Sequence, residues 1–179
     1  ALVGFIILFF FILSFQGLPD FKQLESPDFE LATQVIDVKS REIGRYYTQN
    51  RLPVDYDHLN PHLIDALVAT EDVRFFAHSG VDVQALSRVF LGVVTFNRNK
   101  GGGSTITQQL AKILLTSRER SLYRKVKEAF IAIMIEAKYS KNQILNLYLN
   151  QIFLGHGAYG VESAAKIYFQ KDVWDLNLA

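Results

Sequence analysis

The chain has 179 residues, enough for one domain with a hydrophobic core of its own. Its 19 Lys and Arg residues are balanced by 18 Asp and Glu, so it lacks the basic excess that is typical of a general nucleic-acid binder. The absence of cysteine excludes structural disulfides and thiolate metal sites. The sequence contains no dinucleotide-binding fingerprint and no Walker loop.

The N-terminal run, residues 1–15, is apolar except for Ser14 and is rich in Phe. A membrane-spanning helix needs about 20 apolar residues, and we interpret this shorter run as the outer end of such a span. We therefore predict a transmembrane anchor over residues 1–18. A signal-peptide core is the main alternative, but the exit at 14–17 lacks a small-x-small cleavage site. A buried soluble helix is less favoured, because no polar residue marks an outer face.

A connector with a small hairpin is predicted for residues 19–49. Two strand-like runs lie around Thr33–Val38 and Glu42–Tyr47. The residues between them, 39–41, lack the Asn-Gly or Asp-Gly pair that favours a tight hairpin turn. The pattern is helical after this hairpin, so residues 50–179 are expected to form one mainly helical domain.

The first predicted helix of this domain delivers a carboxylate to its C-terminal end. Asn60 suits the N-cap, and Pro61 suits the first helical position. The buried face is predicted from helical spacing to contain Ile64, Leu67 and Val68. The same spacing continues to Glu71, which would be partly desolvated unless it faces a cleft. A catalytic carboxylate and a helix-end Glu paired with a neighbouring Arg explain this position equally well.

The next helix is expected to begin at Asp82, whose side chain can cap it. Its buried side is predicted to contain Ala85, Leu86, Val89, Phe90 and Val93. Arg88 lies off that apolar stripe. The ordinary explanation for such a residue is a solvated surface charge.

Three consecutive glycines, 101–103, lead directly into another helix start. Glycines alone would suggest a flexible linker, but Thr105 and Gln108 have the spacing of a capping box. The helix carries a polar stripe beside its apolar face, formed by Thr105, Gln108, Gln109 and Lys112. Exposed N–H groups at a helix N-terminus behind a glycine loop attract anions, phosphates especially. The stripe is therefore either a solvated face or one wall of a cleft for sugars and phosphates.

Ser121 is expected to cap a long helix. Its buried face is predicted to contain Leu122, Val126, Phe130, Ile133, Met134 and Ala137. Another face places Glu128 among three cations: Arg120, Arg124 and Lys127. Ordinary helix salt bridges, worth a few tenths of a kcal/mol per pair, explain this group, and so does a cationic pocket for a diphosphate. The later helices, around 141–150 and 161–168, are interpreted as scaffold.

Four short segments carry a more specific pattern. They are Glu71-Asp72-x-x-Phe75-x-x-His78-x-Gly80, Gly102 to Gln109 (GGSTITQQ), Arg124-Lys125-x-x-Glu128, and Lys141-x-x-Ile144-Leu145-x-x-Tyr148-Leu149-Asn150. In this order and at these spacings they resemble the signatures of the bacterial peptidoglycan glycosyltransferases. This domain is shared by class A penicillin-binding proteins and monofunctional transglycosylases. The resemblance covers about residues 50–169; one such motif would be weak evidence, but four in series are highly specific.

The resemblance implies a mainly α-helical, lysozyme-like fold with two lobes around a cleft, a small β-hairpin and a preceding transmembrane helix. A closing C-terminal helix of the family's domain is expected to be missing from the sequence. The implied reaction joins a growing glycan strand, held by its lipid diphosphate, to lipid II, with inversion at the donor's anomeric carbon and release of undecaprenyl diphosphate. The implied partners are lipid II, the lipid-linked strand, the membrane and other cell-wall synthesis proteins, but no nucleic acid. The catalytic domain is expected on the outer side of the bacterial inner membrane.

The resemblance also assigns roles to individual residues. Glu71 matches the general base, and Glu128 matches the family's second glutamate, whose role is more structural and electrostatic. The substrate-binding positions that it implies are Asp72, Phe75, His78, Arg88, Gly103, Ser104, Thr105, Gln108, Gln109, Lys112, Arg120, Arg124 and Lys127. No cofactor is expected to be required, and Mg²⁺ or Mn²⁺ would be accessory, because the sequence shows no dedicated carboxylate cage. Two alternatives remain open: a lysozyme-like enzyme that cleaves glycan, and an inactive membrane scaffold of cell-wall synthesis.

Overall fold

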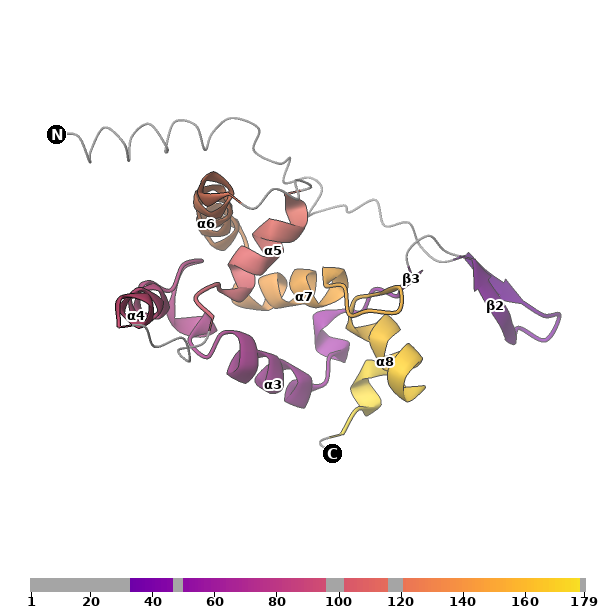
Figure 1. Cartoon of the computed structure of the whole chain (residues 1–179). Helices are drawn as coiled ribbons and strands as arrows, with labels where there is room; N and C mark the ends of the chain where they lie inside the picture. The colour runs from indigo at the N-terminus through magenta and orange to yellow at the C-terminus, as the bar shows by residue number, and fades with distance from the viewer. Residues whose placement is uncertain (1–32, 47–49, 96–101, 116–120, 178–179) are drawn as a thin grey trace.

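The computed structural model describes residues 33–46, 50–95, 102–115 and 121–177. The predicted anchor at 1–18 lies outside these ranges, as does most of the predicted connector. Within the described ranges, no helix combines the length and the apolar character that crossing a membrane requires. The described residues between 50 and 177 form a mainly helical body, and the predicted hairpin lies beside it (Figure 1).

The predicted hairpin is confirmed by two antiparallel strands, β1 (Thr33–Ile36) and β2 (Glu42–Tyr46). Its turn does not depend on an Asn-Gly or Asp-Gly pair. The side chain of Asp37 instead accepts hydrogen bonds from the backbone N–H groups of Lys39 and Arg41, at 2.8 and 2.9 Å. An Asp side chain that bonds the backbone ahead of it stabilises a turn without glycine.

Six α-helices and three short 3₁₀ turns make up the described part of the helical body. In chain order they are η1 (Tyr56–His58), α3 (Pro61–Glu71), η2 (Phe75–Ala77), α4 (Val83–Val94), α5 (Ile106–Leu114), α6 (Leu122–Lys138), α7 (Lys141–Gln151), α8 (Val161–Phe169) and η3 (Val173–Asp175). Helix α5 lies in the middle of the body and packs on both α6 and α7 (Figure 1). This arrangement places the N-terminus of α5 close to the end of α3.

The helix starts predicted from the sequence are confirmed. Asn60 Oδ1 accepts from the backbone N–H of His62 at 2.9 Å. Thr105 and Gln108 form a reciprocal capping box at the start of α5, and Ser121 Oγ accepts from the N–H of Arg124 at the start of α6. Each cap satisfies a backbone donor that the helix itself leaves unpaired, and each contributes about 1 kcal/mol.

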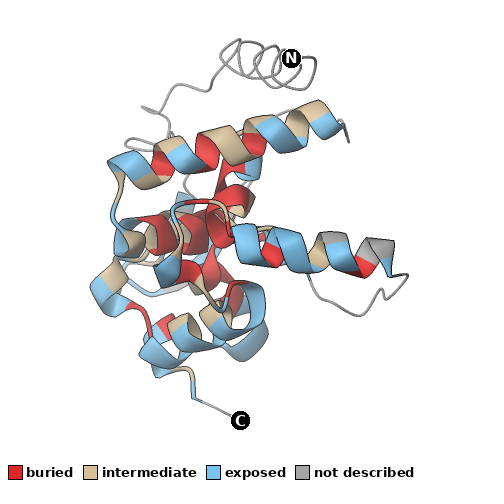
Figure 2. Ribbon diagram, turned by 90° about the vertical axis from the view of Figure 1, so that its left-hand side faces the viewer, coloured by how far each residue is buried: buried red, intermediate tan, exposed pale blue. Residues whose placement is uncertain are grey.

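The hydrophobic core is concentrated where α5, α6 and α7 meet (Figure 2). Ile106 and Leu110 from α5 are fully buried, as are Ile144 and Leu145 from α7. A fully buried aliphatic side chain of this size contributes roughly 1.5–3 kcal/mol. Because α5 is buried on several sides, its polar side chains must find partners or line a cavity.

Helix α6 buries a different face from the one predicted by apolar spacing. Its buried residues are Glu128, Ile131, Ala132 and Ile135, whereas Leu122, Val126 and Ile133 are 85, 42 and 49% exposed. One reason is a close backbone approach. Gly80 has a φ of +89°, and a Cβ there would lie 2.8 Å from the carbonyl carbon of Ala132. The second reason is Glu128, whose charge is neutralised on this inner face.

The N-terminal end of the body is joined to a segment that lies far ahead in the chain. Strand β3 (Asn50–Arg51) pairs in parallel with β4 (Ala158–Tyr159). The side chain of Asn150 then brackets Val54: its Oδ1 accepts from the Val54 N–H and its Nδ2 donates to the Val54 carbonyl, both at 2.8 Å. These contacts connect the first part of the body to α7 and α8.

Candidate active site

Glu71 is the last residue of α3, and its side chain is exposed. Its Oε2 accepts a hydrogen bond from Gln109 Nε2 on α5, at 2.8 Å. The sequence left two possibilities for this carboxylate, partial desolvation or a position that faces a cleft, and the structure shows the second, since Glu71 lines a pocket and no residue of α3 is fully buried. The ion pair with an Arg considered for Glu71 is also not found among the described residues. Glu71 is accessible and is held by an amide.

Asp72, the next residue, fixes the geometry between α3 and α5. It is 7% exposed, and its Oδ2 accepts from the backbone N–H of Ile106, the first residue of α5, at 3.0 Å. Its two oxygens also lie 3.1 and 3.0 Å from His78 Nε2. An anion at a helix N-terminus is favourable because the first N–H groups lack partners within the helix. Gln109, one turn further along α5, is thereby placed opposite Glu71.

A second hydrogen bond holds the N-terminus of α5 in place. Thr105 Oγ1 donates to the carbonyl of Gly80 at 2.6 Å, so the turn after η2 is joined to the N-terminus of α5. Phe75 is fully buried, with Lys141 Nζ 4.3 Å from its ring centre. Lys141 also donates to the carbonyl of His78 at 2.7 Å. The first and second sequence signatures therefore build one packed framework.

Several residues predicted to contact substrate belong to this framework. Phe75, His78 and Gln108 have buried side chains and do not line the pocket beside Glu71, so their predicted contact with a substrate stays a prediction. Asp72 and Thr105 do line that pocket, but their polar atoms are already bonded to protein groups. Burial was not deducible from the motif, because the same residue types serve equally well in a framework and in a binding surface.

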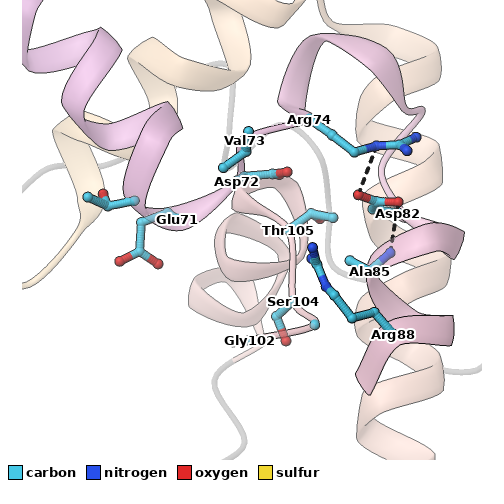
Figure 3. A pocket seen from close by; sticks show the side chains of 12 residues that line it. Glu71, Asp72, Val73, Arg74, Asp82, Ala85, Arg88, Gly102, Ser104 and Thr105 are labelled. Atoms are coloured by element: carbon cyan, nitrogen blue, oxygen red, sulfur yellow. Dashed lines mark hydrogen bonds and ion pairs between the residues drawn. The ribbon is translucent and has the colours of Figure 1, made fainter. Parts of the chain in front are cut away.

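The pocket itself has a volume of about 300 Å³ and is bounded by the end of α3, by α4 and by the glycine loop. Its lining residues are Thr70, Glu71, Asp72, Val73, Arg74, Asp82, Ala85, Arg88, Gly102, Gly103, Ser104 and Thr105. Figure 3 shows Glu71 on one side and Arg88 on the other, with Arg88 extending from α4 toward the loop that carries Ser104 and Thr105. Across the described residues, no hydrogen bond or ion pair to Arg88 is found.

The glycine loop approaches α4 closely. A Cβ on Gly103 would lie 3.1 Å from Cγ2 of Val89, so with a larger residue the Val89 side chain or the loop would have to shift by a few tenths of an ångström. Beside it, Asp82 Oδ2 lies 3.3 Å from Arg74 Nε. Burial opposes ionisation of Asp82, but hydrogen bonds from the N–H groups of Ala85 and Gln84 and the charge of Arg74 outweigh it, and the pKa of Asp82 falls below its ordinary value.

The predicted group of cations around Glu128 is confirmed in part. Glu128 is fully buried, with Oε1 2.9 Å from Arg124 Nε and Oε2 2.7 Å from Lys125 Nζ. Lys125 also donates to Ser104 Oγ at 3.1 Å, and this connects α6 to the glycine loop. Lys125 was not among the predicted site residues. Its position three residues before Glu128, on the same helix face, was the signal that could have identified it.

The remaining predicted cations are distributed differently. Lys112 is exposed in the last turn of α5, and Lys127 is half-buried on α6. Neither these two nor Arg124 and Gln109 line the pocket described above. Arg120 lies outside the described residues. The structure thus brings Glu71, Arg88, Gly103 and Ser104 together at one pocket, and the other predicted cations that it describes are not among the lining residues.

In the part of the chain that the structure describes, no group of three or more His, Asp or Glu side chains is arranged to hold a metal ion. The accessory role of a divalent cation therefore stays a prediction.

Tyr148, interpreted from the sequence as scaffold, is 1% exposed and donates from its hydroxyl to Gln109 Oε1 at 3.0 Å. The group that holds Glu71 is thus held in turn from the core.

Comparison with known proteins identifies the family of this chain. Residues 39–179 match the protein family described as Transglycosylase, and the chain belongs to that family. It is 49% identical to penicillin-binding protein 1A of Aquifex aeolicus (strain VF5) over 172 residues, which are 96% of this chain and 24% of that protein.

Two further relatives are also penicillin-binding proteins. The chain is 42% identical over 161 residues to penicillin-binding protein 1A of Escherichia coli (strain K12), covering 90% of this chain and 19% of that protein. It is 38% identical over 148 residues to penicillin-binding protein 1F of Bacillus subtilis (strain 168), covering 83% and 21%. The chain spans about a quarter or less of the length of these relatives.

Proposed function

We propose that this chain is a peptidoglycan glycosyltransferase that polymerises lipid II into glycan strands. The observation that carries the proposal is the pocket with an accessible carboxylate, Glu71, on one side and Arg88 with the Ser104 loop on the other. A base opposite anion-binding groups is what the transfer of a sugar from a diphosphate requires. Membership of the Transglycosylase family supports the same reaction.

Glu71 acts as the general base in this proposal. It takes the proton from the 4-hydroxyl of the acceptor's N-acetylglucosamine, and that oxygen attacks C1 of the donor's N-acetylmuramic acid. The bond between C1 and the diphosphate oxygen breaks, its electron pair leaves with undecaprenyl diphosphate, and the anomeric centre is inverted. General-base help of this kind contributes roughly 10²- to 10⁴-fold. The exposed position of Glu71 and its hydrogen bond from Gln109 support the assignment.

The leaving diphosphate needs positive charge, and this chain offers it from two directions. Arg88 reaches into the pocket from α4, and Lys125 stands beside Ser104. We assign Arg88, Lys112, Arg120, Arg124, Lys125 and Lys127 as candidates to bind the substrate phosphates. Charge-assisted hydrogen bonds to phosphate are about twice as strong as neutral ones. Gly103 lets the loop backbone approach the substrate, and Gln109 orients the base.

Glu128 serves these cations rather than the substrate. It is fully buried between Arg124 and Lys125, so an incoming substrate cannot reach it without displacing one of them. A buried carboxylate that pairs with two cations fixes their positions and prevents their mutual repulsion. We therefore propose a positioning and electrostatic role for Glu128. Mg²⁺ or Mn²⁺ would be an accessory to the diphosphate, and no cofactor is required.

The membrane belongs to the same proposal. Both substrates carry lipid tails, and an enzyme held at the bilayer surface meets them at a high effective concentration. We propose that residues 1–18 anchor the chain, that residues 19–49 connect the anchor to the domain, and that residues 50–179 are the catalytic domain on the outer side of the inner membrane. The apolar composition of residues 1–15 supports the anchor. Other cell-wall synthesis proteins are candidate partners.

The test is to incubate the detergent-solubilised protein with lipid II and to separate the products by size. Polymer is the expected product. Cleavage of existing glycan without polymerisation would indicate a hydrolase, and absence of both activities would indicate a scaffold. Glu71→Gln should lower polymerisation at least about 100-fold with the fold intact. Asp65→Asn, at an exposed carboxylate on the same helix, is the matched control and should retain activity.

A further inference from the structure

A chain of hydrogen bonds connects the Glu71 carboxylate to the core. Gln109 Nε2 donates to Glu71 Oε2 at 2.8 Å, and the Tyr148 hydroxyl donates to Gln109 Oε1 at 3.0 Å. The three side chains come from α3, α5 and α7. Tyr148 is 1% exposed, Gln109 is half-buried, and Glu71 is exposed at the pocket. The chain of bonds therefore begins on a fixed helix of the core and ends at the proposed base.

The chemistry of the amide explains why the tyrosine matters. An ionised carboxylate only accepts hydrogen bonds, whereas an amide has a donating end and an accepting end. If the Gln109 amide were turned over, its oxygen would face the Glu71 carboxylate, and two acceptors would oppose each other. A hydroxyl donor on the far side of the amide, from Tyr148, occupies the oxygen and so selects the orientation in which Nε2 faces Glu71.

Tyr148 is suited to remain that donor. Burial and the nearby negative charge of Glu71 raise the pKa of Tyr148 to about 12. Its hydroxyl therefore stays protonated at neutral and moderately alkaline pH. The ring is packed in the core, so the hydroxyl is held in place, and it does not line the pocket.

We infer that Tyr148 is a positioning residue for the general base: it fixes the Gln109 amide, which in turn holds the ionised Glu71 carboxylate in one place. This inference rests on the proposed role of Glu71 as the base. Tyr148 acts through Gln109 and makes no contact with substrate. Its loss should consequently lower the rate of the chemical step and leave substrate binding nearly unchanged.

The test compares Tyr148→Phe with the wild-type chain in polymerisation of lipid II. This substitution removes the hydroxyl and keeps the ring. One lost neutral hydrogen bond predicts a kcat that is about 3- to 10-fold lower, with KM within about twofold. Tyr139→Phe is the matched control, because the Tyr139 hydroxyl is buried and has no hydrogen-bond partner. Its kcat and KM should equal those of the wild type. All variants are assayed at a temperature where circular dichroism shows them equally folded.

A double-mutant cycle separates positioning from packing. In a Gln109→Ala background, adding Tyr148→Phe should change kcat by less than about twofold, because the intermediary is already gone. Equal fold losses in both backgrounds, a wild-type kcat for Tyr148→Phe, or a loss that appears only in KM would each overturn the inference. Glu71→Gln serves as the reference. Polymerisation by Glu71→Gln would overturn the base assignment itself, whereas an inactive Glu71→Gln with an unaffected Tyr148→Phe overturns only the role of Tyr148.

Discussion

The buried carboxylate of Asp72 accepts a hydrogen bond from the backbone N–H of Ile106, with 3.0 Å between Oδ2 and N. This bond joins the end of α3 to the first residue of α5. The separation between Glu71 and Gln109 therefore depends on it, since these side chains extend from the same two helices. A residue that does not touch the substrate thus sets the geometry of one that is proposed to react.

Replacing Asp72 with Asn should destabilise the fold. The substitution keeps the shape, but it removes the charge and turns one acceptor oxygen into a donor that faces either His78 or the N–H of Ile106. We expect the free energy of unfolding to fall by about 2–3 kcal/mol, measured by urea denaturation. Asp57→Asn, at an exposed carboxylate, should stay within about 0.5 kcal/mol of the wild type. Equal stability of the two variants would contradict this account.

A pair of glycine variants can separate backbone strain from steric contact. Gly80 and Gly157 both have positive φ, +89° and +75°, but only at Gly80 would a Cβ meet a neighbour, at 2.8 Å from the backbone of Ala132. Gly157→Ala should cost about 1–2 kcal/mol for the backbone conformation alone. Gly80→Ala should cost at least about 1 kcal/mol more, because α6 must move. Equal losses in thermal or urea unfolding would show that α6 moves freely there.

Lys125→Gln should impair polymerisation of lipid II. The ammonium group links the buried Glu128 to Ser104 at the pocket, so its loss removes a positive charge and frees the glycine loop from α6. We expect kcat/KM to fall about tenfold or more. Lys138→Gln, at an exposed lysine near the end of the same helix, provides the control and should behave as the wild type. A Lys125→Gln enzyme with normal kcat/KM would exclude Lys125 from the phosphate site.

Asp82 predicts a specific dependence of stability on pH. Its pKa is lower in the folded state than its ordinary value of 3.8, so ionised Asp82 stabilises the fold at pH values above about 4. This contribution should be lost as the pH falls through 3.8 toward the lower folded-state pKa. Asp82→Asn should therefore have a lower free energy of unfolding than the wild type at pH 7, and this difference in free energy should become smaller in acid. If the difference in free energy of unfolding between the two proteins is constant from pH 7 to pH 2 in urea titrations, ionised Asp82 does not stabilise the fold.

Removal of residues 1–18 tests the anchor proposal. If these residues hold the enzyme at the bilayer and help to accommodate the lipid tail, the deletion should reduce activity on long-tail lipid II more than on short-tail analogues. The comparison requires initial rates for both substrates in the same detergent. Equal reductions would show that the segment does not contribute to lipid-tail recognition.

Local signals were the most predictable part of the fold. Caps at Asn60, Thr105 and Ser121 follow from short-range chemistry between a side chain and the next few backbone groups, and all three are present. The hairpin was also predicted, although its turn depends on Asp37 rather than on a glycine. Such features need no knowledge of the rest of the chain.

Long-range packing was less predictable, and α6 shows why. Apolar spacing favours the face with Leu122, Val126 and Ile133, but the structure turns Glu128 inward. Arg124 and Lys125 of the same helix pair with its carboxylate, and the backbone at Gly80 packs against this face of α6. Hydrophobic periodicity contains no information on which carboxylate will be neutralised by its neighbours.

The sequence predicted which residues belong to the candidate site better than it predicted the role of each residue. The family resemblance named Glu71, Arg88 and Ser104 as site residues, and the structure places all three around one pocket. The motifs did not distinguish residues that line the pocket from residues that support it, such as Phe75 and His78. They also gave no reason to connect Tyr148 with Glu71, since the contact passes through a third helix.

The bracket of Asn150 around Val54 has a consequence for biosynthesis. The two residues are 96 positions apart in the chain, and β3 and its partner strand β4 are separated by a still longer stretch of sequence. At translation rates of about 5–20 residues per second, Val54 emerges roughly 5–20 s before Asn150 exists to bind it. The segment that leads into α3 must therefore stay unpaired during most of the domain's synthesis. Closure of this end of the body is a late event, and a ribosome that stalls before α7 leaves a nascent chain that cannot complete it.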